Sequence, residues 1–338
     1  MSKSTLLSDL RRTWLGLVIS LLCLVAVFYV VDIEQLIAAL KLANIPYIFV
    51  SAAFFSGSVL MRSFAWRTLL GEPLPISRLF FIIQEGLLLN NLLPFRLGEV
   101  GRAVLLSRSS SLSFWQVMST IVVERLLDIV LVVSLLLITI SFVVTEGWAT
   151  TTAFLLGGGV LVGLVILYLM ARNQALVLDW FTKLTSRIPR LEILLRRPLE
   201  TFLAGLGVLK DGTRFARVIG WMIATWLMFL GMYHFALISI LPDAQLAWSA
   251  LGLTAGGLGV AIPAAPGGVG VVEAGVVAVL AVLGIERASA LAYALILRLV
   301  NIMVTTTFGA FGLSRDGQSL MGIYQELRQR KETIDNEQ

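Results

Sequence analysis

Long apolar runs are the feature that most restricts what this chain can fold into. Residues 13–31, TWLGLVISLLCLVAVFYVV, contain no charged side chain. Their length is close to the roughly 20 residues that a helix needs to cross a bilayer. Similar runs recur along the 338 residues, of which 58% are hydrophobic and only 14% are charged, and the mean hydropathy is +0.90. We therefore predict an all-α, polytopic integral membrane protein that forms a single membrane domain over 1–338.

The apolar runs predict six full spans, and the basic residues predict their orientation. The spans are expected at residues 13–31, 46–64, 113–144, 151–171, 218–241 and 288–313. Arg62 and Arg67 are taken to mark the cytoplasmic end of the second span. In this topology 22 of the 26 Lys and Arg residues fall in cytoplasmic segments and two in outer loops. Because Lys and Arg are enriched in cytoplasmic loops, both termini are predicted to lie in the cytoplasm.

Two further segments are apolar but broken. Residues 79–106 contain LPFRLGE, and their apolar arm before Pro94 is roughly 22 Å long as a helix, short of the ~30 Å hydrocarbon core. Residues 246–284 contain APGGVGVVE. Pro interrupts the helical hydrogen-bond ladder, and Gly permits a tight turn. We predict two re-entrant hairpins, whose backbone would be shaped by Pro94, Gly98, Pro266, Gly267, Gly268 and Gly270.

The two broken segments fall in blocks with the same order of features. Residues 46–144 and 218–313 each read as a span, a broken segment with Pro, Gly and Glu, and a second span with an Arg. Glu99 precedes Arg125 by 26 residues, and Glu273 precedes Arg298 by 25. The first hairpin is expected to enter from the cytoplasm and the second from outside. This arrangement predicts an inverted-topology repeat, which in transporters places a site near the midplane. The blocks are joined by a basic cytoplasmic connector, 172–217, and a polar tail, 314–338, ends the chain.

Ionisable residues within the apolar segments are the candidate site. Charges are costly in a bilayer and usually face a cavity or one another. The candidate substrate-binding residues are Asn91, Arg96, Glu99, Arg102, Glu124, Arg125, Glu273 and Arg298. The arginines suit a phosphate group, and the carboxylates would hold the arginines, meet a cationic headgroup or carry a proton. Alternatively, the same residues form buried ion pairs that only lock helices together. Asp128 either joins the set or pairs locally with Arg125, and Glu85 is expected at the cytoplasmic surface.

The rest of the composition excludes several classes of site. The single Cys allows no intrachain disulfide, and with the single His it leaves no metal-binding signature. His234 is expected to be satisfied by a neighbouring helix rather than to relay protons. The sequence pI near 9.6 is attributed to cytoplasmic loops and not to nucleic-acid binding. We expect no cofactor and no metal.

Three stretches in order, NNLLPFRLGEVGRAVLL, VVERLLDIVLV and PAAPGGVGVVEAG, resemble a known family. They are similar to the flippase-like membrane domain of lysylphosphatidylglycerol synthetases, which also occurs as a stand-alone membrane protein, and the resemblance covers about residues 10–313. It implies that the motif residues, including Asn91, Arg96, Glu99, Arg102, Glu124, Arg125 and Glu273, serve lipid movement. Two-domain members add a soluble aminoacyl-transfer domain after the last span. Only residues 314–338 follow here, so we expect no aminoacyl-lipid synthesis and no enzymatic activity.

The expected function is therefore a flippase that moves a headgroup-bearing lipid, anionic or phosphate-bearing, across a bacterial cytoplasmic membrane. Two other classes remain open. One is an integral-membrane lipid-modifying transferase, in which intramembrane carboxylates act as general bases. The other is a transporter for a small molecule or ion, or a scaffold for envelope synthesis.

Overall fold

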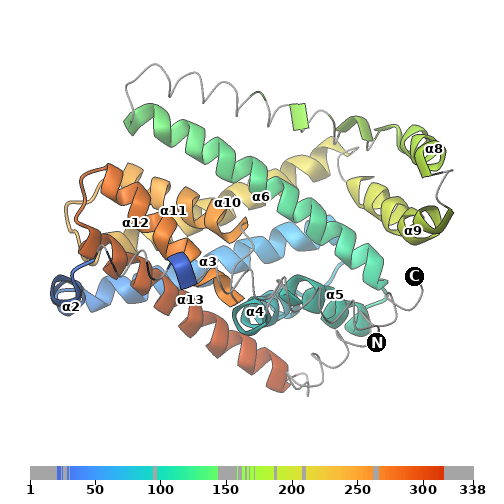
Figure 1. The fold of residues 1–338 in the computed structure, drawn as a ribbon. Coiled ribbons are helices and arrows are strands. Elements are labelled where there is room, and N and C mark those ends of the chain that lie inside the picture. Colours follow the sequence, from blue (N-terminus) through green and yellow to red (C-terminus); the bar gives the residue numbers. More distant parts are fainter. Residues whose placement is uncertain are drawn as a thin grey trace, which may run out of the picture.

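The structure of the chain is a computed structural model in which every described regular element is a helix (Figure 1). It describes residues 31–93, 97–143, 172–185, 189–207, 211–261 and 266–315, together with single residues and short runs between 21 and 29 and between 158 and 170. The helices before the connector are α2 (Ile33–Lys41), α3 (Ile45–Leu70), α4 (Ile76–Leu92), α5 (Leu97–Ser109) and α6 (Phe114–Val143). The later elements are α8 (Gln174–Thr185), α9 (Pro189–Gly205), α10 (Gly212–Ile238), α11 (Leu246–Ala261), the 3₁₀ turn η3 (Pro266–Gly268), α12 (Val271–Val282) and α13 (Arg287–Arg315).

Three of the described helices are long and apolar enough to cross a membrane, and they are α3, α10 and α13. The chain is thus a multi-pass integral membrane protein, as its composition predicted. α6, with 30 residues, occupies the position of the predicted span 113–144. The predicted spans 13–31 and 151–171 lie mostly outside the described residues, so the count of six spans stays a prediction.

The end of the second predicted span was placed too early. α3 continues past residue 64 to Leu70, where Gly71 ends it with a left-handed φ of 75°. Arg62 is consequently an interior residue of α3 and is only 7% exposed. The interpretation of Arg62 as an end marker was wrong, because its charge is compensated inside the protein and does not need water.

The first broken segment is a tight antiparallel helical hairpin, made of α4 and α5. A Cβ placed on Gly98 would overlap the carbonyl oxygen of Gly86, and one placed on Gly101 would lie 2.6 Å from a methyl group of Leu89. The backbone N–H of Gly98 donates to Asn90 Oδ1 at 2.8 Å. Gly86 and Gly98 therefore allow the two helix backbones to touch, which larger residues would prevent.

The second broken segment forms another antiparallel hairpin, made of α11 and α12. Gly259 lies close to Val272, and Gly275 lies close to Ala255. Residues nearer the break on one helix therefore meet residues nearer the break on the other, as in an antiparallel pair. Between the helices Gly267, Gly268 and Gly270 have φ values of 68°, 66° and 87°. Residues other than glycine rarely adopt a positive φ, which explains why glycines occupy the break.

The helices pack around α13 and around the α3–α10 pair. Of the most apolar 18-residue stretch of α13, 67% is buried inside the protein. α3 and α10 lie against each other, with Phe54 stacked on Phe235 at 5.2 Å between ring centroids and Ser51 donating to the carbonyl of Met232 at 2.8 Å. α8 and α9 lie side by side at the end of the molecule where α6 and α10 begin, opposite α2 (Figure 1).

Candidate functional site

Glu124 of α6 is the centre of a buried group of charges. Its side chain is fully buried, and it contacts three arginines from three helices. Arg62 of α3 approaches its Oε1 at 2.8 Å, and Arg102 of α5 donates to both carboxylate oxygens at 3.1 Å. Arg125 Nη2 reaches Oε1 at 2.5 Å. One carboxylate therefore ties together α3, the first hairpin and α6.

Asp128 lies one turn further along α6 and shares two of these arginines. Arg62 pairs with it through two hydrogen bonds of 2.9 and 3.1 Å. Arg125 Nη2 lies 3.2 Å from its Oδ2, so the local i, i+3 pair considered from the sequence is present. The indole N–H of Trp226, on α10, donates to Asp128 Oδ1 at 3.0 Å. The group thus extends to a fourth element of the fold.

Glu99, at the start of α5, forms the accessible edge of the group. Its Oε1 lies 3.6 Å from Arg125 Nε, and the two side chains are 26% and 37% exposed. Every other pair in the group is shorter. Arg62, Glu99, Arg102, Glu124, Arg125 and Asp128, hereafter the central ionic network, contain three positive and three negative charges. The network is therefore neutral in itself, and only the Glu99–Arg125 edge is both loose and open.

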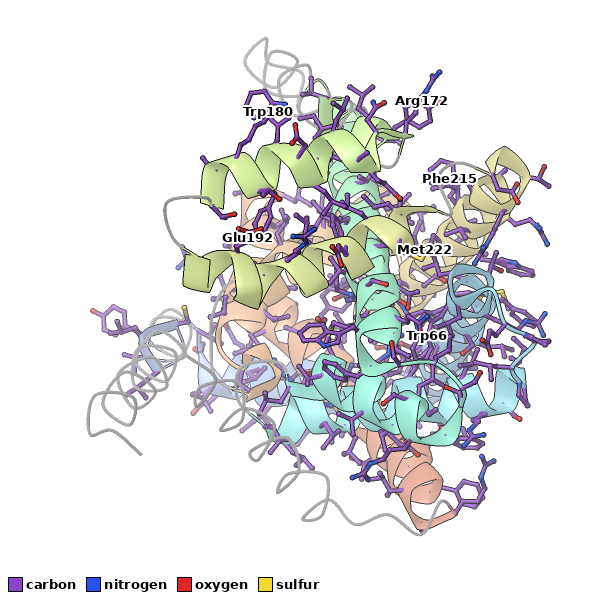
Figure 2. All side chains as sticks on the ribbon, turned by 90° about the vertical axis from the view of Figure 1, so that its right-hand side faces the viewer. Trp66, Arg172, Trp180, Glu192, Phe215 and Met222 are labelled. Carbon is purple, nitrogen blue, oxygen red and sulfur yellow. The ribbon has the colours of Figure 1, made fainter. Side chains whose placement is uncertain are left out.

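Arg102 is held from two sides. Its guanidinium carbon lies 4.2 Å from the centre of the Trp66 ring, in the geometry of a cation–π contact. Trp66 is fully buried, and its indole N–H donates to Thr120 Oγ1 at 3.0 Å. Figure 2 labels Trp66 beside α6. Arg102 is fixed in direction and is therefore a structural member of the network rather than a mobile surface charge.

The second hairpin carries its own ion pair. Arg298 of α13 contacts Glu273 Oε1 at 2.7 Å through Nε and Nη2, and its Nη1 donates to the carbonyl of Gly267 at 2.6 Å. Glu273 Oε2 accepts the N–H of Gly270 at 2.8 Å. Both side chains are largely buried, with 5% and 17% exposure. The pair holds the irregular backbone of the break in place, because it satisfies polar groups that a bilayer cannot.

Asn91 brings the two breaks into contact. Its amide nitrogen donates to Asn301 Oδ1 at 2.9 Å and to Thr305 Oγ1 at 3.0 Å, both on α13. A Cβ on Gly267 would lie 3.3 Å from Asn91 Oδ1. The second break therefore packs against the end of α4, the helix that leads into the first break.

The predicted site residues thus fall into two groups. Glu99, Arg102, Glu124 and Arg125 meet in the central ionic network, while Asn91, Glu273 and Arg298 meet at the second break. Each Glu–Arg pair that the repeat spacing matched, Glu99 with Arg125 and Glu273 with Arg298, is an ion pair. Pro94 and Arg96 lie outside the described residues, as does the side chain of Pro266.

Three network partners were missed from the sequence. Arg62 was assigned to the end of a span, and neither Trp66 nor Trp226 was among the candidate residues. A signal existed for Arg62, since apolar sequence continues after it for two more turns. Glu85 was expected at the surface but is 1% exposed and packs beside Gly312 of α13. His234 Nδ1 lies 3.1 Å from Ser249 Oγ on α11, which confirms that a neighbouring helix satisfies it.

The described part of the chain contains no group of three or more His, Cys, Asp or Glu side chains suited to a metal ion. In the central ionic network each carboxylate is already within ion-pair distance of an arginine.

Comparison with known proteins confirms the family resemblance that the three sequence motifs indicated. Residues 13–309 match the family described as the lysylphosphatidylglycerol synthase TM region. Two membrane proteins of Methanocaldococcus jannaschii are similar. UPF0104 membrane protein MJ1078 is 26% identical over 222 residues, covering 66% of this chain and 91% of the relative. UPF0104 membrane protein MJ1595 is 26% identical over 186 residues, covering 53% of this chain and 55% of the relative. No solved structure gave a significant match.

Proposed function

Because the chain belongs to the family of the lysylphosphatidylglycerol synthase TM region, we propose that it moves a headgroup-bearing lipid between the leaflets of a bacterial cytoplasmic membrane without changing the lipid covalently. The substrate is an anionic or otherwise phosphate-bearing lipid. Its headgroup passes through the protein while its acyl chains stay in the bilayer.

The observation that carries this proposal is the open edge of an otherwise buried, neutral network. The Glu99–Arg125 contact, at 3.6 Å, is the longest of the network and has the most exposed partners. A phosphate would replace Glu99 at Arg125, because a guanidinium matches phosphate geometry and donates several hydrogen bonds. Glu99, released from Arg125, is then free to meet a cationic part of the same headgroup.

The closed part of the network supports the same function by fixing the binding group. Arg125 is also within 3.2 Å of both Glu124 and Asp128, which are themselves bound by Arg62. The guanidinium is therefore pre-positioned before a lipid arrives, which reduces the ordering cost of binding. Arg102 adds positive charge close by without leaving Glu124.

We assign the second group of predicted residues to the same pathway. Glu273, Arg298 and Asn91 hold the second break against the end of α4, next to the first break. Two hairpins that enter from opposite faces and meet in this way form the inverted repeat of a transporter. Rocking of one repeat against the other would expose the headgroup site to each leaflet in turn.

The orientation follows from the distribution of basic residues. Both termini and the connector lie in the cytoplasm, since 22 of 26 Lys and Arg residues fall on that side of the proposed topology. The first hairpin then opens to the cytoplasm and the second to the outside. Cysteine labelling from each side, with one position near 40 and one near 200, tests this arrangement.

Reconstitution into liposomes tests the proposal. Fluorescent lipids with anionic, zwitterionic and sugar headgroups are placed in one leaflet, and their appearance in the other is followed with a membrane-impermeant quencher. We expect the purified protein to accelerate movement of phosphate-bearing lipids and Arg125→Gln to abolish it. Glu34→Gln, which removes an exposed charge from α2, is the matched control and should leave the rate unchanged.

Mass spectrometry of the same lipids separates the proposal from a lipid-modifying enzyme. The lipid masses should be unchanged after movement. Folded protein that moves none of the panel, or that converts a lipid to a new species, would exclude a simple flippase.

A further inference from the structure

The connector 172–217 carries the excess positive charge of the chain. It contains nine Lys or Arg residues and four Asp or Glu residues, so its net charge equals the +5 of the whole protein. Its described helices are α8, α9 and the first residues of α10; α8 and α9 pack on each other, and α9 packs on α6. With 12 residues, α8 is roughly 18 Å long and cannot span a bilayer.

One face of α8 is fixed to the rest of the protein. Val177 and Leu178 pack against the cluster that contains Leu203 and Leu206 of the α9 region. The amide nitrogen of Gln174 donates to the carbonyl of Leu203 at 2.5 Å. The orientation of α8 is therefore set by its inner face, and its outer face is presented in a defined direction.

That outer face carries large apolar side chains at every fourth position. Leu176, Trp180 and Leu184 are 58%, 74% and 82% exposed. Residues four apart lie on the same side of a helix, so the three form one stripe. In Figure 2 Trp180 projects from α8 on the side away from α9.

A polar edge borders this stripe. Asp179 and Lys183 are exposed and form an ion pair of 2.7 Å, and Ala175 continues the same edge. The helix therefore has three longitudinal zones: an inner face packed on the α9 region, an exposed apolar stripe and an exposed edge that carries an ion pair. A helix with an apolar stripe, a polar edge and flanking basic residues is typical of one that lies in the membrane interface.

We propose that α8 lies in the plane of the leaflet on the connector side, with Leu176, Trp180 and Leu184 between the acyl chains and anionic lipid headgroups around the basic residues. The position of α8, at the end where α6 and α10 begin, puts it at the edge of the membrane-crossing helices (Figure 1). Tryptophan is favoured at this depth, because its ring is apolar and its N–H can reach water. The docking does not depend on whether lipid is transported.

Charge decides between lipid and a second copy of the chain as the occupant. Two connectors that met through α8 would bring two segments of net charge +5 together, which opposes association. An anionic leaflet surface attracts the same segment. The stripe and the charge together therefore fit an anionic membrane surface.

Site-specific labelling of the full chain in vesicles tests the docking. Cys23, the single cysteine, is first replaced by Ser, and an environment-sensitive NBD fluorophore is then attached at Leu184→Cys or, as the matched control, at Ala175→Cys. Both positions are exposed, so neither change removes a buried contact. Vesicles contain phosphatidylcholine alone or mixed with phosphatidylglycerol.

We expect lipids spin-labelled near the headgroup to quench the label at 184 several-fold more than the label at 175, and aqueous iodide to show the reverse order. Phosphatidylglycerol should strengthen the difference, and the pair Arg172→Gln and Lys183→Gln should weaken that lipid dependence, whereas Lys41→Gln should not. Equal iodide quenching at 184 and 175 in phosphatidylglycerol vesicles would overturn the proposal. So would shielding of 184 from both quenchers, because a protein surface would then cover the stripe.

Discussion

Arg62 of α3 and Asp128 of α6 form a two-pronged ion pair, with Nη1–Oδ2 at 2.9 Å and Nη2–Oδ1 at 3.1 Å. This bidentate pair restricts the rotation of α3 relative to α6, because both hydrogen bonds form only when the guanidinium and the carboxylate are aligned. Arg62 also contacts Glu124, so it compensates two carboxylates at once. This arginine therefore sets the stability of the central ionic network.

Arg62→Met should destabilise the protein by about 3–5 kcal/mol, because it leaves two buried carboxylates short of a partner. Arg67→Met, on the same helix but exposed, is the matched control and should change stability by less than about 1 kcal/mol. Thermal unfolding in detergent measures both. Equal melting temperatures for the two variants would contradict a stabilising role for Arg62.

Substitutions of Glu124 and of Glu99 should have different effects on the free energy of unfolding and on the transport rate. Glu124→Gln removes the anion shared by three arginines and should cost about 3–5 kcal/mol of unfolding free energy. Glu99→Gln affects a partly exposed, longer pair and should cost less than about 1 kcal/mol. The transport rate of Glu99→Gln, however, should fall about tenfold or more for a lipid with a cationic group, as loss of a charge-assisted hydrogen bond predicts.

Melting curves and the liposome assay on the same protein preparations check this separation. Movement of lipids without a cationic group provides the internal control. If Glu99→Gln retains the full rate for all headgroups, Glu99 is not a binding residue.

Gly98→Ala should disrupt the first hairpin. The new Cβ would overlap the carbonyl oxygen of Gly86, and backbone cannot move aside as a flexible side chain can. We expect a loss of about 1–3 kcal/mol, typical of overpacking. Gly220→Ala, on the exposed face of α10 with nothing within 4 Å, should be neutral or stabilising by up to about 1 kcal/mol. Chemical unfolding in mixed micelles compares the two, and equal stability would exclude the tight backbone contact.

The contact between Asn91 and Thr305 should appear as coupling in a double-mutant cycle. Asn91→Ala and Thr305→Val each remove one end of the 3.0 Å hydrogen bond. Coupling energies between membrane helices average about 0.6 kcal/mol and reach about 1.7. Thr306, which is exposed on the neighbouring face of α13, provides the control cycle. Thr306→Val should add independently to Asn91→Ala, and independent addition for Thr305→Val as well would show that the bond contributes nothing.

Helix positions could be predicted where apolar runs were continuous. The predicted segments 113–144 and 288–313 correspond to Phe114–Val143 and Arg287–Arg315. The end of α3 could not be predicted, because Arg62 and Arg67 were interpreted as marking the cytoplasmic end of the span. Arg62 remains inside the helix since Glu124 and Asp128, more than sixty residues away, neutralise it. No local pattern carries that information.

The candidate site could be predicted only in part. Spacing in the two blocks matched Glu99 with Arg125 and Glu273 with Arg298, and both pairs form. Trp226 could not be found, because its bond to Asp128 joins α10 to α6 across 98 residues. That Glu273 also receives the N–H of Gly270 depends on the left-handed backbone of the break, which sequence spacing does not specify.

The two turns that bound the first hairpin touch each other, since Ser111 Oγ donates to Glu72 Oε2 at 3.2 Å. Arg214 of α10 donates hydrogen bonds to the carbonyl oxygens of Thr68 and Leu69 at the end of α3. The two helices of the hairpin are in backbone contact at Gly86 and Gly98, so they pack closely on each other. Movement of the hairpin away from its neighbours would have to pull Arg102 from Glu124 and Asn91 from Asn301 of α13.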